Sequence, residues 1–179
     1  MDKKGEIEQR MDQQKQNSGF PADGHGCSGL EQTETKAGDK PYRIGLVMGV
    51  FDLFHVGHLR LIQRAKEQCD YLRVGVLSDE LVIRFKINPP IISQDDRMEI
   101  LKGLRAVDEV VLIDDTPDRL TEWKRRPFDC FFSGNDHSDK PYWIWEQQEL
   151  KKLGADLVYF PYTEEESTTK IRARIRETE

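Results

Sequence analysis

Cysteines are scarce in this sequence, and none of them has the spacing of a metal ligand. Cys27, Cys69 and Cys130 lie far apart along the 179 residues. An odd and sparse set of this kind argues against a disulfide scaffold and fits a reducing compartment. His25 lies near Cys27 among glycines, a pattern more typical of a linker than of a metal site. We therefore expect a cytoplasmic protein without a metal site of its own.

Long apolar runs and an excess of basic residues are absent as well. No stretch is long and apolar enough to span a bilayer, and the lysines near the N-terminus are not followed by the apolar segment of a signal peptide. The formal net charge is -6 at pH 7. A general nucleic-acid-binding protein needs a basic face, whereas a local basic pocket for phosphate is compatible with this balance. Membranes and nucleic acids are therefore not expected partners.

The N-terminal part of the chain has little apolar content. It is rich in Gln, Lys, Glu, Asp, Gly and Ser, and its few bulky apolar residues follow no helical or strand period. Such a segment cannot bury enough apolar surface to offset the conformational entropy lost on ordering. We therefore predict a disordered polar tail over residues 1–40 and one folded domain over residues 41–179.

From Tyr42 onward, short apolar runs alternate with helical patterns. The runs typical of buried strands are 42–48, 71–77, 109–113, 128–134 and 156–160. The segments with helical patterns are 58–69, 93–104, 116–125, 142–154 and 167–177. We expect Ser93 to cap the second of these helices and Gly154 to end the fourth. The alternation predicts an α/β fold, a Rossmann-like, doubly wound sheet of five parallel strands with helices on both faces.

The stretch GVFDLFHVGH, from Gly49 to His58, joins the first predicted strand to the helix that follows. In parallel sheets ligands bind at this carboxyl edge, and the free N–H groups of a helix N-terminus attract phosphate. Gly49 and Gly57 keep side chains out of the way of a ligand, while His55 and His58 add donors. Fixed donors of this kind stabilise the charge that develops when a phosphate oxygen attacks the α-phosphorus of a nucleoside triphosphate. The other common phosphate-binding motif, the P-loop, does not occur.

This string resembles the signature of the cytidylyltransferase-like nucleotidyltransferases, G-x-F-D-x-x-H-x-G-H. Every fixed position is matched, by Gly49, Phe51, Asp52, His55, Gly57 and His58. The resemblance runs from Tyr42 to Arg176 and is strongest toward glycerol-3-phosphate and choline-phosphate cytidylyltransferases. It implies transfer of CMP from CTP, accompanied by Mg²⁺, to a small phosphorylated alcohol, which gives a CDP-alcohol and pyrophosphate. By analogy alone it also implies a homodimer.

The resemblance assigns roles to further residues by their position. His55, His58 and Lys86 are the expected catalytic residues, and Lys86 and Arg119 are the expected contacts to the acceptor. Arg119 would equally suit the surface of a helix, and Arg97 is a further cation that would suit a structural role. The expected nucleotide-binding residues are Gly49, Val50, Phe51, Asp52, Gly57, Arg105, Gly134, Asp136, Thr163, Ser167, Thr168 and Thr169.

The last part of the resemblance departs from the family pattern. YTEEESTTKIR stands where the family has R-T-x-G-I-S-T-[ST], so that Tyr162 replaces an arginine and Glu165 and Glu166 replace glycine and isoleucine. The hydroxyls that follow still form a helix N-terminus suited to the β- and γ-phosphates. The lost arginine removes a cation from the expected pocket, and Arg172 is one candidate to replace it.

Three alternatives stay open at this point. An adenylyltransferase of the same superfamily that acts on a sugar phosphate would share the signature, and the departures from the last motif would also suit an inactive nucleotide-binding module. The aromatic residues Tyr142, Trp143 and Trp145 would suit a cage for a quaternary amine, although this spacing is more typical of helix packing.

Overall fold

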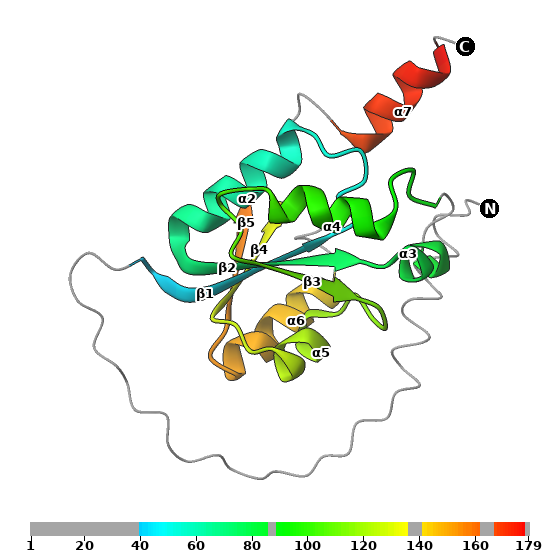
Figure 1. Ribbon diagram of the computed structural model, residues 1–179. Coiled ribbons are helices and arrows are strands. Elements are labelled where there is room, and N and C mark those ends of the chain that lie inside the picture. The colour runs from blue at the N-terminus through cyan, green and yellow to red at the C-terminus, as the bar shows by residue number, and fades with distance from the viewer. Residues whose placement is uncertain (1–39, 86–88, 136–140, 162–166, 178–179) are drawn as a thin grey trace.

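The computed structural model describes residues 40–85, 89–135, 141–161 and 167–177. Strands and helices alternate along most of this chain, as the sequence predicts (Figure 1). The elements are β1 (Tyr42–Gly49), α2 (Val56–Gln68), β2 (Cys69–Leu77), α3 (Asp79–Phe85), α4 (Gln94–Lys102), β3 (Glu109–Ile113), α5 (Arg119–Arg125), β4 (Cys130–Gly134), α6 (Pro141–Lys152), β5 (Asp156–Phe160) and α7 (Thr168–Glu177).

The five strands form one parallel sheet in the order β3-β2-β1-β4-β5. The chain moves outward from β1 to β3 and then returns to the other side of β1, so the strand order reverses between β1 and β4. Helices α2 and α4 cover one face of the sheet, and α5 and α6 cover the other (Figure 1). The predicted Rossmann-like, doubly wound fold is therefore confirmed, and its reversal point lies at the end of β1.

Alternate side chains of β1 supply the two cores of the domain. Val47 points to the α2 side, where it belongs to a buried cluster with Ile62. Leu46 points to the opposite face and belongs to a cluster with Phe131 and Leu150. A strand that is buried on both faces reads as a continuous apolar run, which is why β1 is visible in the sequence.

The predicted helix boundaries are partly confirmed. Ser93 caps α4, since its hydroxyl accepts from the N–H of Asp96. Gly154, with φ of +82°, follows the end of α6 in the left-handed conformation that glycine favours. The prediction for α5 is wrong at its start: Asp118 is the N-cap, so Pro117 precedes the helix instead of lying in its first turn.

One helix, α3, was not predicted from the sequence. It spans only Asp79–Phe85, too few residues for a recognisable apolar period. Its start is fixed by the Ser78 hydroxyl, which accepts from the N–H of Leu81. Burial of Leu81 and Val82 then holds it against the core.

The predicted tail lies almost wholly outside the described residues, so its disorder stays a prediction. The described chain begins at Lys40, whose ammonium donates to the carbonyls of Lys66 and Cys69 at 2.6 and 3.0 Å. These bonds anchor the chain to the end of α2 just before β1. Among the described helices, none is long and apolar enough to cross a membrane.

Candidate active site

The signature loop between β1 and α2 has an unusual backbone. Phe51 and Leu53 have φ of 56° and 49°, in the left-handed region that side chains other than glycine rarely adopt. Such residues cost on the order of 1 kcal/mol each and persist only where their surroundings hold them. The buried ring of Phe51 lies against Gly49, where an added Cβ would come within 3.1 Å of the ring. Gly49 therefore makes room for Phe51, a different reason from the ligand approach that the sequence predicted.

The two histidines lie together at the N-terminus of α2. His55 is the N-cap, and its Nδ1 accepts from the N–H of Gly57 at 3.1 Å. The rings of His55 and His58 stack, with centroids 3.9 Å apart and planes 27° from parallel. Because Nδ1 of a neutral His55 is an acceptor here, its proton is on Nε2, the nitrogen that can donate to a ligand.

Aromatic rings hold His58 in place. The rings of Phe51 and Phe54 lie with centroids 5.3 and 5.6 Å from that of His58, the first edge-on. The strained turn at Phe51 thus places the ring of Phe51 against the ring of His58. The loop positions the predicted catalytic pair through packing as well as through the helix cap.

Asp52 has a structural position that the sequence did not reveal. It is 4% exposed, and one carboxylate oxygen accepts from the N–H groups of Ile91 and Ile92, both at 3.0 Å. Its other oxygen pairs with Arg172 at 2.7 Å. Burial alone would raise the pKa of Asp52, but the bonds from Arg172, Ile92 and Ile91 outweigh it and lower that pKa. This carboxylate therefore joins the signature loop to other segments of the chain, and its predicted nucleotide contact stays a prediction.

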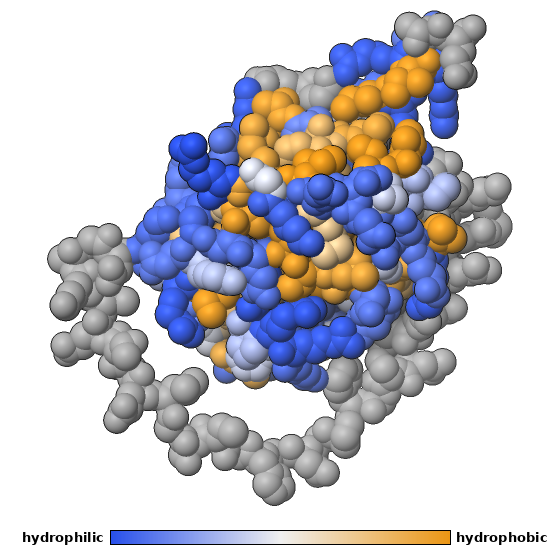
Figure 2. Space-filling view, viewed as in Figure 1, coloured by the Kyte–Doolittle hydropathy of each residue, from blue (hydrophilic) through white to orange (hydrophobic). Residues whose placement is uncertain are grey.

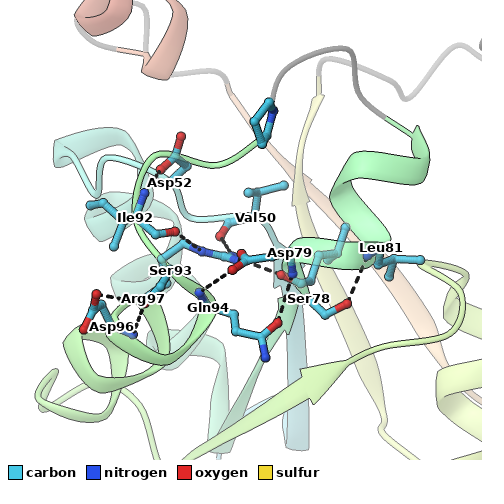
Figure 3. A network of polar contacts seen from close by, with 12 residues as sticks. Val50, Asp52, Ser78, Asp79, Leu81, Ile92, Ser93, Gln94, Asp96 and Arg97 are labelled. Atoms are coloured by element: carbon cyan, nitrogen blue, oxygen red, sulfur yellow. Dashed lines mark hydrogen bonds and ion pairs between the residues drawn. The ribbon is translucent and has the colours of Figure 1, made fainter.

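Arg97 supports the same loop from the α4 side (Figure 3). It is 1% exposed, and it donates to the carbonyls of Val50, Leu77 and Ile92. Its charge is balanced by Asp79. Val50, predicted as a nucleotide contact, thus has its carbonyl directed to Arg97. The structural role considered for Arg97 is the one the structure shows.

A reciprocal pair of hydrogen bonds locks α3 to α4. The amide oxygen of Gln94 accepts from the N–H of Asp79 at 3.0 Å, and the carboxylate of Asp79 accepts from the N–H of Gln94 at 3.1 Å (Figure 3). Sequence reasoning missed this support because α3 itself was missed. The network fixes the ends of β1 and β2 relative to one another.

The hydroxyls before and within α7 meet the signature loop. Ser167 caps α7, since its oxygen accepts from the N–H of Lys170 at 3.2 Å. Thr168 donates from its hydroxyl to the carbonyl of Asp52 at 2.9 Å. Thr169, the third predicted contact, is exposed. The N-terminus of α7 therefore contacts the same loop that leads into α2, while the predicted phosphate contacts of these hydroxyls stay predictions.

Four of the remaining predicted residues are one glycine at the end of a strand and three residues that the structure does not describe. Gly134 ends β4, the strand next to β1 at the reversal point, so it lies on the carboxyl edge of the sheet with the histidines. Lys86, Asp136 and Thr163 lie outside the described residues, and their roles stay predictions.

Arg105 is an exposed residue of the turn before β3. There it lines a shallow pocket with Leu59, Gln63 and Lys66 of α2. Sequence position could not reveal this, since the helix α4 carries the chain back from one edge of the sheet to the other. Its predicted nucleotide contact stays a prediction.

Arg119 is also not available in the way that the sequence predicted. It is 4% exposed, its guanidinium pairs with the fully buried Glu146, and its backbone N–H donates to the same carboxylate at 2.7 Å. Burial lowers the pKa of Arg119 to about 10. The guanidinium lies 3.6 Å from the ring centre of Trp143 and occupies that ring's face, so the structure favours neither an acceptor contact by Arg119 nor the aromatic cage.

Among the described residues, no group of three or more His, Cys, Asp or Glu side chains is placed to hold a metal ion. A magnesium ion that arrives on the phosphates of a nucleotide keeps several waters and needs few protein ligands. The arrangement is therefore compatible with Mg²⁺ as part of a nucleotide complex.

The chain is similar to known proteins in sequence and in fold. The family model described as cytidylyltransferase-like matches residues 46–174. The chain is 36% identical over 135 residues to the glycerol-3-phosphate cytidylyltransferase of Bacillus subtilis (strain 168), covering 73% of this chain and 95% of that protein. It is 35% identical over 144 residues to the FAD synthase of Pyrococcus abyssi (strain GE5 / Orsay), covering 79% of this chain and 97% of that protein.

Two further similarities are less complete. The bifunctional protein HldE of Pseudomonas aeruginosa (strain LESB58) is 39% identical over 137 residues, which cover 75% of this chain but only 28% of that protein. The chain thus spans under a third of the length of this relative. The solved structure of the lipopolysaccharide core biosynthesis protein from Thermoplasma volcanium GSS1 has a TM-score of 0.57 at 23% identity, covering 70% of this chain and 99% of that one. That likeness shows the fold alone.

Proposed function

Because the chain belongs to the cytidylyltransferase-like family, a family of nucleotidyltransferases, we propose that it transfers CMP from CTP to a small phosphorylated alcohol. A phosphate oxygen of the acceptor attacks the α-phosphorus, a new P–O bond forms, and the bond to the β-phosphate breaks. The products are a CDP-alcohol and pyrophosphate. The stacked pair of His55 and His58, at the helix N-terminus beside the strand reversal, is the observation that carries this proposal.

The histidines contribute electrostatic stabilisation and placement. Negative charge grows on the α-phosphate oxygens and on the leaving pyrophosphate during the transfer, and preorganised donors are worth most where charge develops. Nε2 of His55, whose partner nitrogen is used in the helix cap, donates toward the α-phosphate. His58, held by the two phenylalanine rings, contacts the same phosphate group from its other side.

The N-terminus of α7 supports the triphosphate in this proposal. Its free N–H groups and the positive end of the helix dipole favour the β- and γ-phosphates. Thr169 is exposed there, whereas Thr168 is half-buried and donates to the carbonyl of Asp52. Mg²⁺ bound to the nucleotide neutralises part of the phosphate charge.

The similarity to an FAD synthase favours a second candidate, an ATP-dependent transfer, because FAD contains an adenylyl group. The acceptor would then be a flavin phosphate or, as the sequence left open, a sugar phosphate. The glycerol-3-phosphate cytidylyltransferase, similar over nearly all of its length, favours CTP and an alcohol phosphate instead. Only the base and the acceptor differ between the candidates, since the reacting phosphorus is the same.

Pyrophosphate release tests the proposal and separates the candidates. The purified chain is given CTP or ATP with Mg²⁺ and, in turn, glycerol 3-phosphate, phosphocholine, phosphoethanolamine, a sugar phosphate or FMN. We expect release with CTP and one of the alcohol phosphates. Release with ATP alone would replace the first candidate by the second, and no release with any pair, together with measurable nucleotide binding, would indicate an inactive binding module.

A further inference from the structure

Asp52 is the meeting point of segments that are far apart in the sequence. Its carboxylate accepts from the N–H groups of Ile91 and Ile92, before α4, and from the guanidinium of Arg172 in α7. The same nitrogen of Arg172 also donates to the carbonyl of Pro89 at 2.8 Å. Arg172 therefore bridges the signature loop and the segment before α4, although it lies 120 residues after Asp52.

Polar contacts attach α7 to the signature loop. Thr168 and Arg172 lie one helical turn apart on the same face, and both bind Asp52, the first at its carbonyl and the second at its carboxylate. None of the residues of α7, all of them described, is buried. Apolar side chains along this projecting helix face outward in Figure 2, and Ile175 is 49% exposed. The contacts of Thr168 and Arg172 with the signature loop therefore matter for the position of α7.

The loop that Arg172 contacts is the one that carries backbone strain. Asp52 stands between the two left-handed residues, Phe51 and Leu53, and precedes the cap residue His55 by three positions. A strained turn keeps its shape only while its surroundings hold it. Loss of Arg172 would leave one oxygen of a buried carboxylate without its charged partner, which is costly and favours rearrangement.

We propose that Arg172 is a positioning residue for the transfer reaction, which holds the N-termini of α2 and α7 in register through Asp52. This rests on the proposed function, in which the first terminus carries the histidines and the second the triphosphate. Arg172 does not touch the reacting atoms. It sets the position of the groups that do, and its effect reaches both ends of the nucleotide.

Three variants in the full chain test this role. Arg172→Ala removes the bridge, Arg172→Lys keeps the charge without the fork of donors, and Arg176→Ala removes an equally charged, exposed residue of the same helix. Each is assayed by pyrophosphate release at a temperature where circular dichroism shows it folded. We expect Arg172→Ala to lower kcat about tenfold to a hundredfold, the scale of a small misplacement, and to raise the nucleotide KM. Arg172→Lys should recover part of both losses, and Arg176→Ala should match the parent chain.

Hydrogen exchange gives a readout that does not depend on activity. In Arg172→Ala we expect faster amide exchange confined to residues 51–55 and 168–171, with the amides of β1 unchanged. Faster exchange throughout the domain, or unchanged kcat and KM, would show that Arg172 only stabilises the fold and would overturn the proposal. If the parent chain releases no pyrophosphate with any substrate pair, the proposed function fails by itself. The exchange pattern then decides whether Arg172 still holds the two helix N-termini together, and unchanged exchange in residues 51–55 would refute it.

Discussion

Replacement of His55 by two different residues separates its structural from its catalytic contribution. The structure gives this side chain a cap bond from the N–H of Gly57 through Nδ1, and in the proposed function its Nε2 donates to phosphate. His55→Ala removes both functions. His55→Asn keeps a good capping group, since asparagine is among the preferred N-cap residues, but it removes the imidazole donor.

The expected magnitudes follow from these two contacts. Loss of the cap in His55→Ala should lower the free energy of unfolding by about 1 kcal/mol, which lowers Tm by about 4 °C for a domain of this size. His55→Asn should unfold within about 0.5 kcal/mol of the parent chain. Both variants should lose about a hundredfold in kcat, the usual effect of removing one donor at the developing charge. Nucleotide affinity should change much less, because the helix N-termini still hold the phosphates.

Urea unfolding, pyrophosphate release and direct titration of CTP measure the three quantities. His25→Ala, in the predicted tail, serves as the control for removal of a histidine. Near-normal kcat in His55→Asn would refute the donor role of the imidazole, whatever happened to stability. Equal loss of stability in the alanine and asparagine variants would instead show that the bond to Gly57 is not what matters at this position.

Five further predictions concern the site and the chain around it. His58→Ala should lower kcat about a hundredfold with little change in Tm, and unchanged kcat at saturating substrates would contradict its role. The pKa of Asp52 in the folded chain lies below its ordinary value of 3.8. The ionised carboxylate therefore stabilises the fold above that value, and this contribution is lost as pH falls through the folded pKa. Acid unfolding followed by circular dichroism should accordingly be less steep in Asp52→Asn. Excess EDTA should abolish pyrophosphate release and added Mg²⁺ should restore it, whereas release in EDTA alone would argue against the nucleotide complex. Deletion of residues 1–39 should leave Tm and turnover nearly unchanged, and light scattering on the same sample tests the expected homodimer, which a monomer mass would exclude.

Much of the fold was predictable because its strands read as short apolar runs. EVVLI and DLVYF became β3 and β5 with the predicted bounds, although both are edge strands in which only Ile113, Leu157 and Phe160 are buried. Helix α3 was missed because seven residues show no period, and the start of α5 was misplaced because Asp118, not the proline before it, supplies the cap. The strand order also needed the structure, since local pattern does not determine which strands pair.

The site was predictable where backbone and helix ends create it. The histidines lie at the joint of β1 and α2, and the hydroxyls lie at the start of α7, because a strand end and a helix start are fixed by local sequence. The charged residues were harder to assign. All three of these charged residues are buried and bound to protein partners, although the sequence alone would equally allow each to contact a ligand: Asp52, Arg97 and Arg119. A charge in the sequence does not show whether its partner will be a substrate or another side chain.

The hydrogen-bond partners of Arg97 explain why a charged side chain is buried at this edge of the sheet. Arg97 binds three carbonyls and Asp79, so its donors satisfy the ends of strands and loops that have no ladder partner at the carboxyl edge of the sheet. Arg172, on helix α7, likewise donates to the carboxylate of Asp52 and to the carbonyl of Pro89. A site at a strand reversal has irregular backbone on every side, because helices begin there and the sheet ends there. Such backbone needs donors and acceptors from side chains, and once these are in place the imidazoles of the signature are fixed at the joint of β1 and α2, where the proposed function requires them.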